Sequence, residues 1–364
     1  MQASVQPTKF FPALEGLRGI AIIAVIIYHN FPYGDSLFGW LGVDLFFVLS
    51  GFLITSILFR SVNIDKPSAY FKKFYIRRAL RIFPLYYLFL FAFLFLLPAL
   101  GIFNNEVSEY QEDKFWFIFY GQNWLFTNNF PETSHCLNHF WSLAVEEQYY
   151  IFWPIIIILL KKPRYLLIFL IGFLLFLFCF RSYIWNAHYE GFNYTNFYTF
   201  TRFDGICIGS IIAILSIQKK EFILRHTASI VTGLAALNFI FYFANTSGNL
   251  PYLAFIGYTT FAAMFGILVY ELAYGNANWL KKIFSGNMLR FLGRISYGLY
   301  MFHWPVHYFL RKPLFIFFND SLHLPKVYNQ ILIAFITTAI SIVFSLISYY
   351  FFEMKFLRLK EKFQ

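Results

Sequence analysis

Long apolar runs, separated by short polar segments, follow one another along almost the whole chain. Each run is close to the roughly 20 residues that a helix needs to cross a bilayer. We predict ten membrane spans, at residues 11–32, 38–60, 80–101, 138–160, 164–182, 201–217, 226–245, 250–273, 291–310 and 328–352. Because a helix satisfies its own backbone hydrogen bonds, the predicted fold class is all-α, a polytopic transmembrane helix bundle.

The composition supports this prediction, since 59% of the residues are hydrophobic and only 13% are charged. An ordinary soluble domain is about 25% charged. No internal repeat is visible, and no stretch has the composition of a soluble catalytic domain. We therefore expect residues 1–364 to form one membrane-embedded domain with no appended soluble domain.

The net charge of +11 could indicate either a nucleic-acid partner or positively charged cytoplasmic loops. The distribution of the charge along the chain decides between these two. With the amino terminus inside, most of the 29 Lys and Arg residues fall on the cytoplasmic side. The outside receives only Lys114, Arg181, Arg311, Lys312 and Lys326. This bias follows the positive-inside rule. It predicts that both termini are cytoplasmic, and it explains the basic charge without nucleic acid.

The first span carries two ionisable residues, Arg18 and His29, in the stretch LRGIAIIAVIIYHN. Their spacing of 11 positions is about three helical turns, which puts both side chains on one face and about 16 Å apart. In the structural interpretation, Arg18 anchors the inner end of the span and His29 is hydrogen-bonded to a neighbouring helix. The functional one is a cation near the cytoplasm and an imidazole that acts as general base in a shared cavity.

Three arginines, Arg77, Arg78 and Arg81, cluster just before the third span. On a helix Arg77 and Arg78 each lie about one turn from Arg81, so the three form a close basic cluster. The structural interpretation is an anchor in anionic lipid. The functional one is a grip on phosphate, because the planar guanidinium matches phosphate oxygens.

The fourth span begins with NHFWSLAVEEQYY, in which two glutamates head an apolar run. Ser142 and Glu146 are four residues apart and share a face, whereas Glu147 points about 100° away. Because a buried carboxylate needs a partner, we expect Glu146 to pair with His29 and to orient its imidazole. His139, one turn before Ser142, is a weaker alternative base.

The remaining polar residues of the spans favour structural roles. Gly42, Ser50 and Gly51 in the second span permit close helix packing, while Asp44 is balanced between packing and function. We expect Arg202 and Asp204 to pair with each other. His303 in SYGLYMFHWPV is more compatible with a structural contact than with a second base.

We find no signature of a metal or soluble-enzyme site and expect no metal. The three cysteines, Cys136, Cys179 and Cys207, are scattered and give neither a disulfide framework nor a zinc pattern. A phosphate-cradling glycine loop, a paired-histidine zinc motif and a Gly-x-Ser-x-Gly elbow are also missing from the sequence.

Taken together, five stretches resemble the integral-membrane acyltransferase-3 family, O-acyltransferases that modify bacterial surface glycans. They are LEGLRGIAIIAVIIYH, GVDLFFVLSGFLIT, RRALRIFP, HFWSLAVEEQYY and SYGLYMFHWPV, in the family's order between residues 14 and 306. The resemblance implies about ten helices in the bacterial inner (plasma) membrane. It also implies transfer of an acyl group, usually acetyl, from cytoplasmic acyl-CoA to a hydroxyl on the outer side.

The resemblance also assigns roles to individual residues. The implied catalytic residues are His29, Ser142 and Glu146, and those implied to meet the coenzyme are Arg18, Arg77, Arg78 and Arg81. Glu15 stands where many relatives have Asp. Some relatives carry a further extracytoplasmic domain that completes the transfer. Since this chain ends at Gln364, we expect direct transfer or a separate partner.

The expected reaction uses acetyl-CoA as acyl donor and a carbohydrate or glycolipid as acceptor, with the lipid bilayer around the bundle. His29 either activates the acceptor hydroxyl or becomes acylated itself. An alternative from another class is a proton-coupled transporter or lipid-linked glycan flippase, with His29, Asp44 and Glu146 as a proton relay. Trp116, Trp124, Asn123, Asn128 and Asn129 of the outer loop suit either a sugar or a membrane interface.

Overall fold

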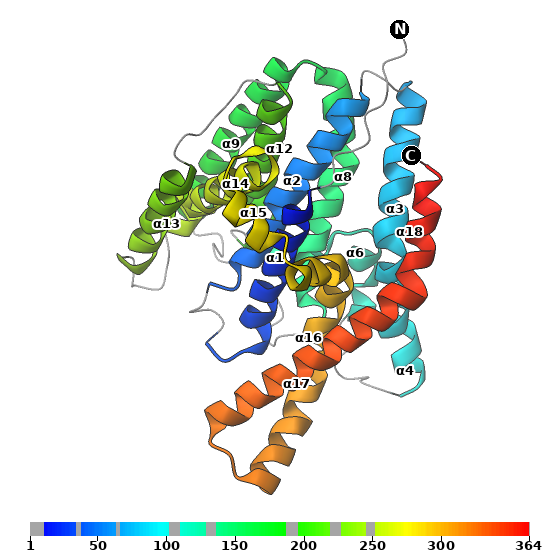
Figure 1. The fold of residues 1–364 in the computed structure, drawn as a ribbon. Helices are drawn as coiled ribbons and strands as arrows, with labels where there is room; N and C mark the ends of the chain where they lie inside the picture. The colour runs from blue at the N-terminus through cyan, green and yellow to red at the C-terminus, as the bar shows by residue number, and fades with distance from the viewer. Residues whose placement is uncertain are drawn as a thin grey trace.

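The computed structural model describes residues 11–33, 38–62, 66–101, 110–128, 136–186, 196–218, 227–244 and 252–363. Asn129 of the outer loop lies outside these ranges, and so do Lys9, Lys219, Lys220 and Arg225, which count among the basic residues of the predicted cytoplasmic side. Within the described residues all regular structure is helical (Figure 1). The predicted all-α class is therefore confirmed.

Seven helical segments of the described chain are long and apolar enough to cross a membrane. They are α1 (Pro12–Asn30), α2 (Leu41–Ser61), α3 (Pro67–Phe91) continuing through η1 (Ala92–Leu96) into α4 (Leu97–Ala99), η2 (Asn138–Phe140) with α8 (Trp141–Leu160), α9 (Pro163–Asn186), η3 (Leu253–Gly257) with α14 (Tyr258–Tyr274), and α17 (Lys326–Ile347) continuing through η4 (Ser348–Glu353) into α18 (Met354–Glu361).

Two shorter apolar helices, α12 (Asp204–Ile217) and α13 (Thr227–Ala244), match two further predicted spans. The predicted span at 291–310 lies within α16 (Asn287–Leu322), a 36-residue helix with polar and charged side chains along its length. Short helices α6 (Lys114–Ile118), α7 (Gln122–Asn128), α11 (Thr199–Arg202) and α15 (Asn278–Phe284) connect the long ones. Each predicted span thus coincides with a helix, while ten crossings and two cytoplasmic termini stay predictions.

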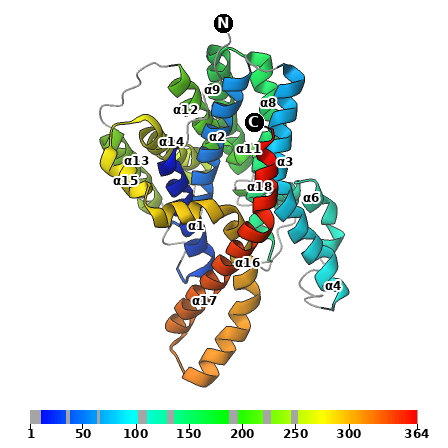
Figure 2. The ribbon, with the colours of Figure 1, turned by 45° about the vertical axis from the view of Figure 1, so that its right-hand side comes forward.

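Helices α1 and α2 run through the middle of the bundle, and α16 with α17 forms a hairpin that projects from one end (Figures 1 and 2). The most extensive packing joins α1 to α16 and α2 to α12. Pro12, Pro67 and Pro163 begin their helices, where a missing N–H costs no hydrogen bond. The packing of α1 on α16 brings the amino-terminal motif beside a segment from late in the chain.

Glycines allow the closest of these crossings, as the sequence predicted for the second span. A Cβ on Gly51 would lie 2.1 Å from the carbonyl oxygen of Ile206 in α12, and one on Gly209 would lie 2.1 Å from that of Val48 in α2. A Cβ on Gly42 would lie 2.4 Å from the carbonyl oxygen of Ala21 in α1. The backbones of α1, α2 and α12 therefore approach as only small residues permit.

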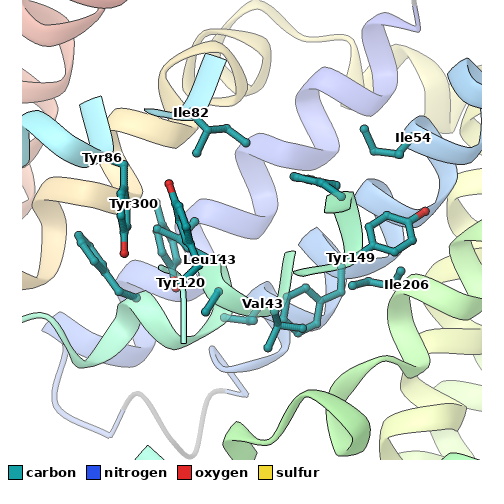
Figure 3. Close-up of a cluster of buried hydrophobic side chains, with 14 of the residues drawn as sticks. Val43, Ile54, Ile82, Tyr86, Tyr120, Leu143, Tyr149, Ile206 and Tyr300 are labelled. Atoms are coloured by element: carbon teal, nitrogen blue, oxygen red, sulfur yellow. The ribbon is translucent and has the colours of Figure 1, made fainter. Parts of the chain in front are cut away.

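Buried aromatic and aliphatic side chains fill the space between α2, α3, α8 and α16 (Figure 3). Val43, Ile82, Leu143 and Tyr300 belong to this cluster and also form walls of a cavity inside it. The core thus supplies the apolar lining against which the polar side chains of that cavity stand.

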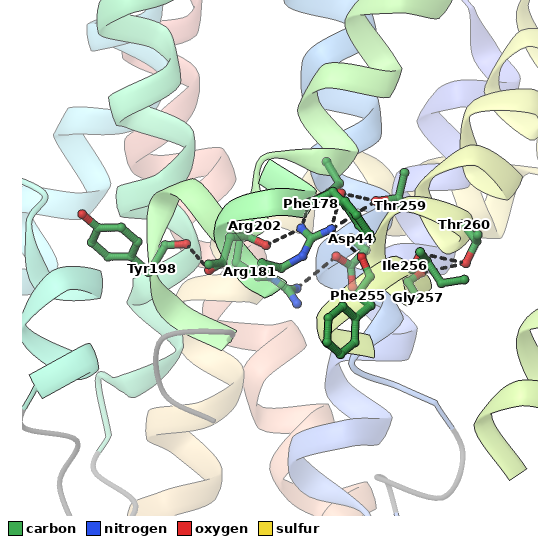
Figure 4. A network of polar contacts seen from close by, with 12 residues as sticks. Asp44, Phe178, Arg181, Tyr198, Arg202, Phe255, Ile256, Gly257, Thr259 and Thr260 are labelled. Atoms are coloured by element: carbon green, nitrogen blue, oxygen red, sulfur yellow. Dashed lines mark hydrogen bonds and ion pairs between the residues drawn. The ribbon is translucent and has the colours of Figure 1, made fainter. Parts of the chain in front are cut away.

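Two buried ion pairs tie α2 to α11 and α9 to α12 (Figure 4). Arg202 Nη2 lies 3.0 Å from Asp44 Oδ1, and Arg181 pairs with Asp204. The predicted pairing of Arg202 with Asp204 is wrong, because residues two apart at a helix start do not face each other. The Arg202 guanidinium also lies 4.0 Å from the ring centre of Tyr258. Asp44 therefore serves the packing of the bundle.

We predict that Gly51→Ala destabilises the bundle, because the added methyl group would collide with the backbone of α12. Overpacking of this kind costs about 1–3 kcal/mol. Gly172→Ala on α9 is the matched control, since a Cβ there meets nothing within 4 Å. Thermal unfolding of the detergent-solubilised variants measures the difference. A Gly51→Ala protein as stable as the Gly172→Ala protein would contradict this packing.

Candidate active site

Two cavities that share a wall lie between α1, α2 and α16. The first, which we call the central cavity, has a volume of about 190 Å³. Its polar lining consists of Arg18, Ser50, Arg78, Arg81, Ser142, Glu146, Glu147, Tyr150, Ser296, Tyr297 and Tyr300. The second, the basic cavity, has a volume of about 620 Å³. Its charged lining consists of Glu15, Arg18, Arg60, Arg81, Arg294, Glu353, Arg358, Lys360 and Glu361.

The two cavities meet at a shared set of side chains. Arg18, Arg81 and Tyr297 line both of them, together with Leu53 and Ile57. Because basic residues outnumber acidic ones in the basic cavity, it presents a cationic entrance to the smaller central cavity. This entrance lies on the side to which the positive-inside rule assigns the cytoplasm.

Arg18 stands where the two cavities join. Its Nη2 donates a hydrogen bond of 3.1 Å to Ser296 Oγ of α16, and its guanidinium lies 5.7 Å from the ring centre of Phe46. His29, further along α1, also contacts α16, through His303. The prediction that Arg18 and His29 use one face of their helix is confirmed, and that face packs on α16.

The three clustered arginines of α3 are not equivalent. Arg78 and Arg81 line the central cavity, and Arg81 also lines the basic one. The guanidinium of Arg78 lies 5.6 Å from the ring centre of Tyr150, which orients it. Arg77 is not among the described residues that line either cavity, and it interacts electrostatically with Lys360 of α18. The structure therefore brings Arg78 and Arg81 to the site and leaves Arg77 at its periphery.

Glu146 is bound by side chains of α2 and of its own helix. Its Oε1 accepts a 2.6 Å hydrogen bond from Ser50, and its Oε2 accepts one of 3.3 Å from Tyr150. Arg18 is its nearby cation. Ser50, which the sequence favoured as a packing residue, is thus a direct partner of this carboxylate. Only the tertiary contact reveals that role.

The predicted pairing of His29 with Glu146 is wrong for the described residues. The hydrogen-bond partners of His29 are the Val25 carbonyl and His303. The physical reason is the distance along the axis of α1. Glu146 lies beside Arg18, and His29 is about 16 Å further along the helix.

Glu147 also lines the central cavity, although it points away from Glu146 on their helix. Its Oε1 is buried and has no hydrogen-bond partner among the described residues. Sequence reasoning gave Glu147 no role. The adjacent acid pair in an apolar run was the signal that could have found it.

Ser142 lies at the other end of the central cavity, in contact with α16. The Tyr300 hydroxyl donates to the His139 carbonyl oxygen at 2.6 Å. Because a tyrosine has a single proton, the 2.6 Å bond between Ser142 and Tyr300 must be donated by Ser142. This chain of hydroxyl groups leads from the cavity toward the histidines.

Three histidine rings meet beyond Tyr300. The rings of His303 and His29 have centres 5.1 Å apart, and His139 lies 5.1 Å from His303 on another side. His303 and His139 are buried, and neither ring nitrogen of His139 makes a well-formed hydrogen bond in the described structure. His303, which the sequence favoured as a structural contact, is thus the direct neighbour of His29.

The hydrogen bonds of the two rings determine where their protons lie. His303 Nδ1 is 2.8 Å from the Tyr300 carbonyl oxygen, which can only accept, so Nδ1 carries the proton and Nε2 is a bare acceptor. His29 Nδ1 is 3.1 Å from His303 Nε2 and 3.1 Å from the Val25 carbonyl oxygen. Both of these atoms accept, so His29 Nδ1 is also protonated. The lone pair of His29 therefore resides on Nε2, as a general base requires.

A third cavity opens on the far side of His29. This outer cavity has a volume of about 580 Å³. It is lined by His29, Asn30, Phe31, Pro32, His307, Arg311, Lys312, Phe315, Ile316, Gln330 and Ile333. The histidine pair stands between the outer cavity and the Ser142–Tyr300 end of the central cavity. His29 is therefore open to the outer cavity, and Tyr300 and His303 separate it from the central cavity.

Comparison with known proteins identifies a family. The model of the acyltransferase-3 family, described as an acyltransferase domain, matches residues 11–350. The peptidoglycan O-acetyltransferase OatA of Listeria monocytogenes is 31% identical over 322 residues, which is 82% of this chain and 49% of that protein. A Staphylococcus aureus protein named "Putative O-acetyltransferase" is 30% identical over 96% of this chain and 57% of its own length.

A Bacillus subtilis protein named "Putative peptidoglycan O-acetyltransferase YrhL" is 31% identical over 84% of this chain and 50% of its own length. The chain therefore spans about half the length of these relatives. No solved structure gives a significant match. With the family model covering nearly all of the described bundle, the chain belongs to the acyltransferase-3 family of integral-membrane proteins.

Proposed function

We propose that this chain is an O-acyltransferase of the bacterial inner membrane. It transfers an acetyl group from cytoplasmic acetyl-CoA to a hydroxyl of a cell-wall carbohydrate outside the membrane. The observation that carries the proposal is the position of His29, which lines the outer cavity and is linked through His303 to Tyr300 at the wall of the central cavity. The names of the relatives support peptidoglycan as the acceptor.

The residues of the two inner cavities fit the chemistry of the donor. Coenzyme A carries phosphates at one end, and the guanidinium groups of Arg18, Arg78 and Arg81 can form paired hydrogen bonds with phosphate oxygens. The basic cavity is the wider of the two and would hold the nucleotide. The narrow central cavity would hold the extended arm that ends in the thioester, near Ser142.

In the proposed mechanism the acceptor hydroxyl arrives from the outer cavity and gives its proton to His29 Nε2. Its oxygen bonds to the acyl carbon, the carbon–sulfur bond breaks, and the imidazolium returns the proton to the departing thiolate. General-base assistance of this kind is typically worth 10²–10⁴-fold. His303 acts as a positioning residue, because it accepts from His29 Nδ1 and fixes the tautomer.

Ser142 and Glu146 have different parts in this proposal. Ser142 lies at the end of the central cavity next to Tyr300, where its hydroxyl can hydrogen-bond the acyl carbonyl. Glu146 balances the positive charge of Arg18 and, through Ser50 and Tyr150, keeps the cavity's polar groups in place. Neither residue needs to touch His29.

His29→Ala should abolish acetyl transfer while the protein reaches normal membrane levels. The measurement is the acetyl content of cell-wall glycan, by mass spectrometry, in cells that carry either form. A loss of about 10²-fold or more is expected, since the base is removed. Undiminished acetylation would remove His29 from the chemistry.

The role of His303 is tested by a pair of substitutions. His303→Leu removes the acceptor for His29 Nδ1 and should lower kcat by about 10–100-fold with little change in KM for acetyl-CoA. His303→Gln offers an amide oxygen in its place and should restore much of kcat. Initial rates in proteoliposomes provide both constants. Equal activity of the two variants would show that His303 has only a packing role.

The arginines of α3 are expected to act unequally on the donor. Arg81→Gln should raise KM for acetyl-CoA about tenfold, since a hydrogen bond to a charged group is worth about 1.5–3 kcal/mol. Arg77→Gln should change it less, because Arg77 does not line either cavity among the described residues. Kinetics with varied acetyl-CoA compare them, and a larger effect at Arg77 would contradict the placement of the nucleotide.

A further inference from the structure

We propose that the outer cavity is a binding site for an acidic saccharide, whose carboxylate or phosphate is held by Arg311 and Lys312. This inference rests on the proposed function and adds the chemical class of the acceptor. The outer cavity is the place to look, because His29 lines it and the acceptor hydroxyl must approach that ring.

One face of α16 connects the reacting imidazole with the two cations. His303, His307 and Arg311 follow one another at intervals of four residues and therefore lie along the same side of the helix. The axial distance from His303 to Arg311 is roughly 12 Å. A molecule whose hydroxyl lies at His29 can thus extend along this face until another part of it reaches Arg311 and Lys312.

The middle of the cavity offers acceptors for sugar hydroxyls. His307 Nδ1 lies 3.0 Å from Thr337 Oγ1, and the Thr337 hydroxyl donates to the Ile333 carbonyl oxygen at 2.9 Å. The His307 ring must therefore donate from Nδ1, which leaves its Nε2 able to accept.

Asn30 adds a second acceptor in the same cavity. It is 4% exposed, its Nδ2 donates to Thr338 at 3.3 Å, and its Oδ1 is buried without a partner in the described structure. A buried polar atom without a partner is costly. A hydroxyl group of a bound saccharide would satisfy it.

The positive charge of Arg311 and Lys312 is not neutralised by any acidic residue among the described residues that line the outer cavity. Arg311 and Lys312 line it and are exposed, and no Asp or Glu is among the described residues that line it. Arg181 and Arg202, by contrast, are buried against Asp204 and Asp44. Because the predicted outer side holds few basic residues, two adjacent ones in the cavity that His29 also lines favour an anionic ligand.

The anion has two chemical sources that the cavity does not distinguish. It can be a carboxylate of the saccharide itself, or a phosphate through which the saccharide is attached to a carrier. Both are small oxyanions that an arginine and a lysine hold in the same way. The experiment therefore includes an arm for each.

The test uses the full chain in phosphatidylcholine liposomes with radiolabelled acetyl-CoA. The acceptors are an oligosaccharide ending in a uronate, its neutral methyl ester, and the same oligosaccharide carrying a 1-phosphate instead. For the unsubstituted protein we expect kcat/KM at least tenfold higher with one of the two acids than with the ester. The preferred acid identifies the source of the anion.

The double substitution Arg311→Gln with Lys312→Gln should reduce that ratio to near one by raising KM for the acid. KM for acetyl-CoA should not change. The matched control, Lys114→Gln with Lys326→Gln, removes two other cations of the predicted outer side and should keep the ratio. A ratio that survives the loss of Arg311 and Lys312 overturns the proposal, and so does a ratio of one in the unsubstituted protein.

A binding measurement separates this proposal from the proposed function. If no acceptor is acetylated, the proposed function fails, and the thermal shift produced by each saccharide then decides. Stabilisation by an acid but not by its ester, lost in the double variant and kept in the control, supports the acidic site. Equal shifts with acid and ester overturn it. Phosphatidylglycerol is added to a second set of liposomes: a gain in rate that the unsubstituted protein shows and the double variant loses, with the acid-to-ester ratio unchanged, would assign the two cations to lipid and overturn it too.

Discussion

The contact between His29 of α1 and His303 of α16 is the interaction on which the rest of the site depends. It joins residues 274 positions apart in the chain, and it exists because α1 packs along α16. The backbone carbonyl of Tyr300 accepts a hydrogen bond from His303 Nδ1 and so sets the tautomer of His303. His303 Nε2 then accepts from His29 Nδ1 and sets the tautomer of His29. The lone pair of His29 is thereby directed by hydrogen bonds alone, with a neutral partner where many hydrolases use a carboxylate.

A neutral partner is consistent with the surroundings. An ionised carboxylate in an apolar bundle needs a cation and several hydrogen bonds, because removing it from water is costly. Glu146 has such support from Ser50, Tyr150 and the nearby Arg18. Around His29 the neighbours are His303 and Trp304. Uncharged rings thus separate the charged groups of the inner cavities from the outer cavity.

Buried charges elsewhere in the bundle are neutralised by ion pairs. Asp44 of α2 and Arg202 of α11 neutralise each other, and so do Arg181 of α9 and Asp204 of α12. These pairs stabilise the helix packing that carries α2 past α12, and α2 in turn presents Ser50 to the central cavity. In the cavities that we propose to bind anionic substrates, basic residues outnumber acidic ones in the basic cavity, and the described lining of the outer cavity includes Arg311 and Lys312 but no acid.

Much of the architecture and several site residues could be predicted from the sequence. Apolar runs fixed the helices, because a span must bury its backbone polar groups internally whatever surrounds it. The spacing of Arg18 and His29 placed them on one face, because the helical repeat is local geometry. Glycines at Gly42 and Gly51 indicated close packing for the same local reason.

Only the tertiary structure decided which of these faces meet. The sequence paired His29 with Glu146 and Arg202 with Asp204, whereas in the structure His29 meets His303 of α16 and Arg202 of α11 meets Asp44 of α2. The outer cavity, too, is formed by segments far apart in the chain. A sequence specifies the direction of a side chain within its own helix, but its neighbour is set by how two helices cross and slide against each other. That depends on contacts summed over both helices.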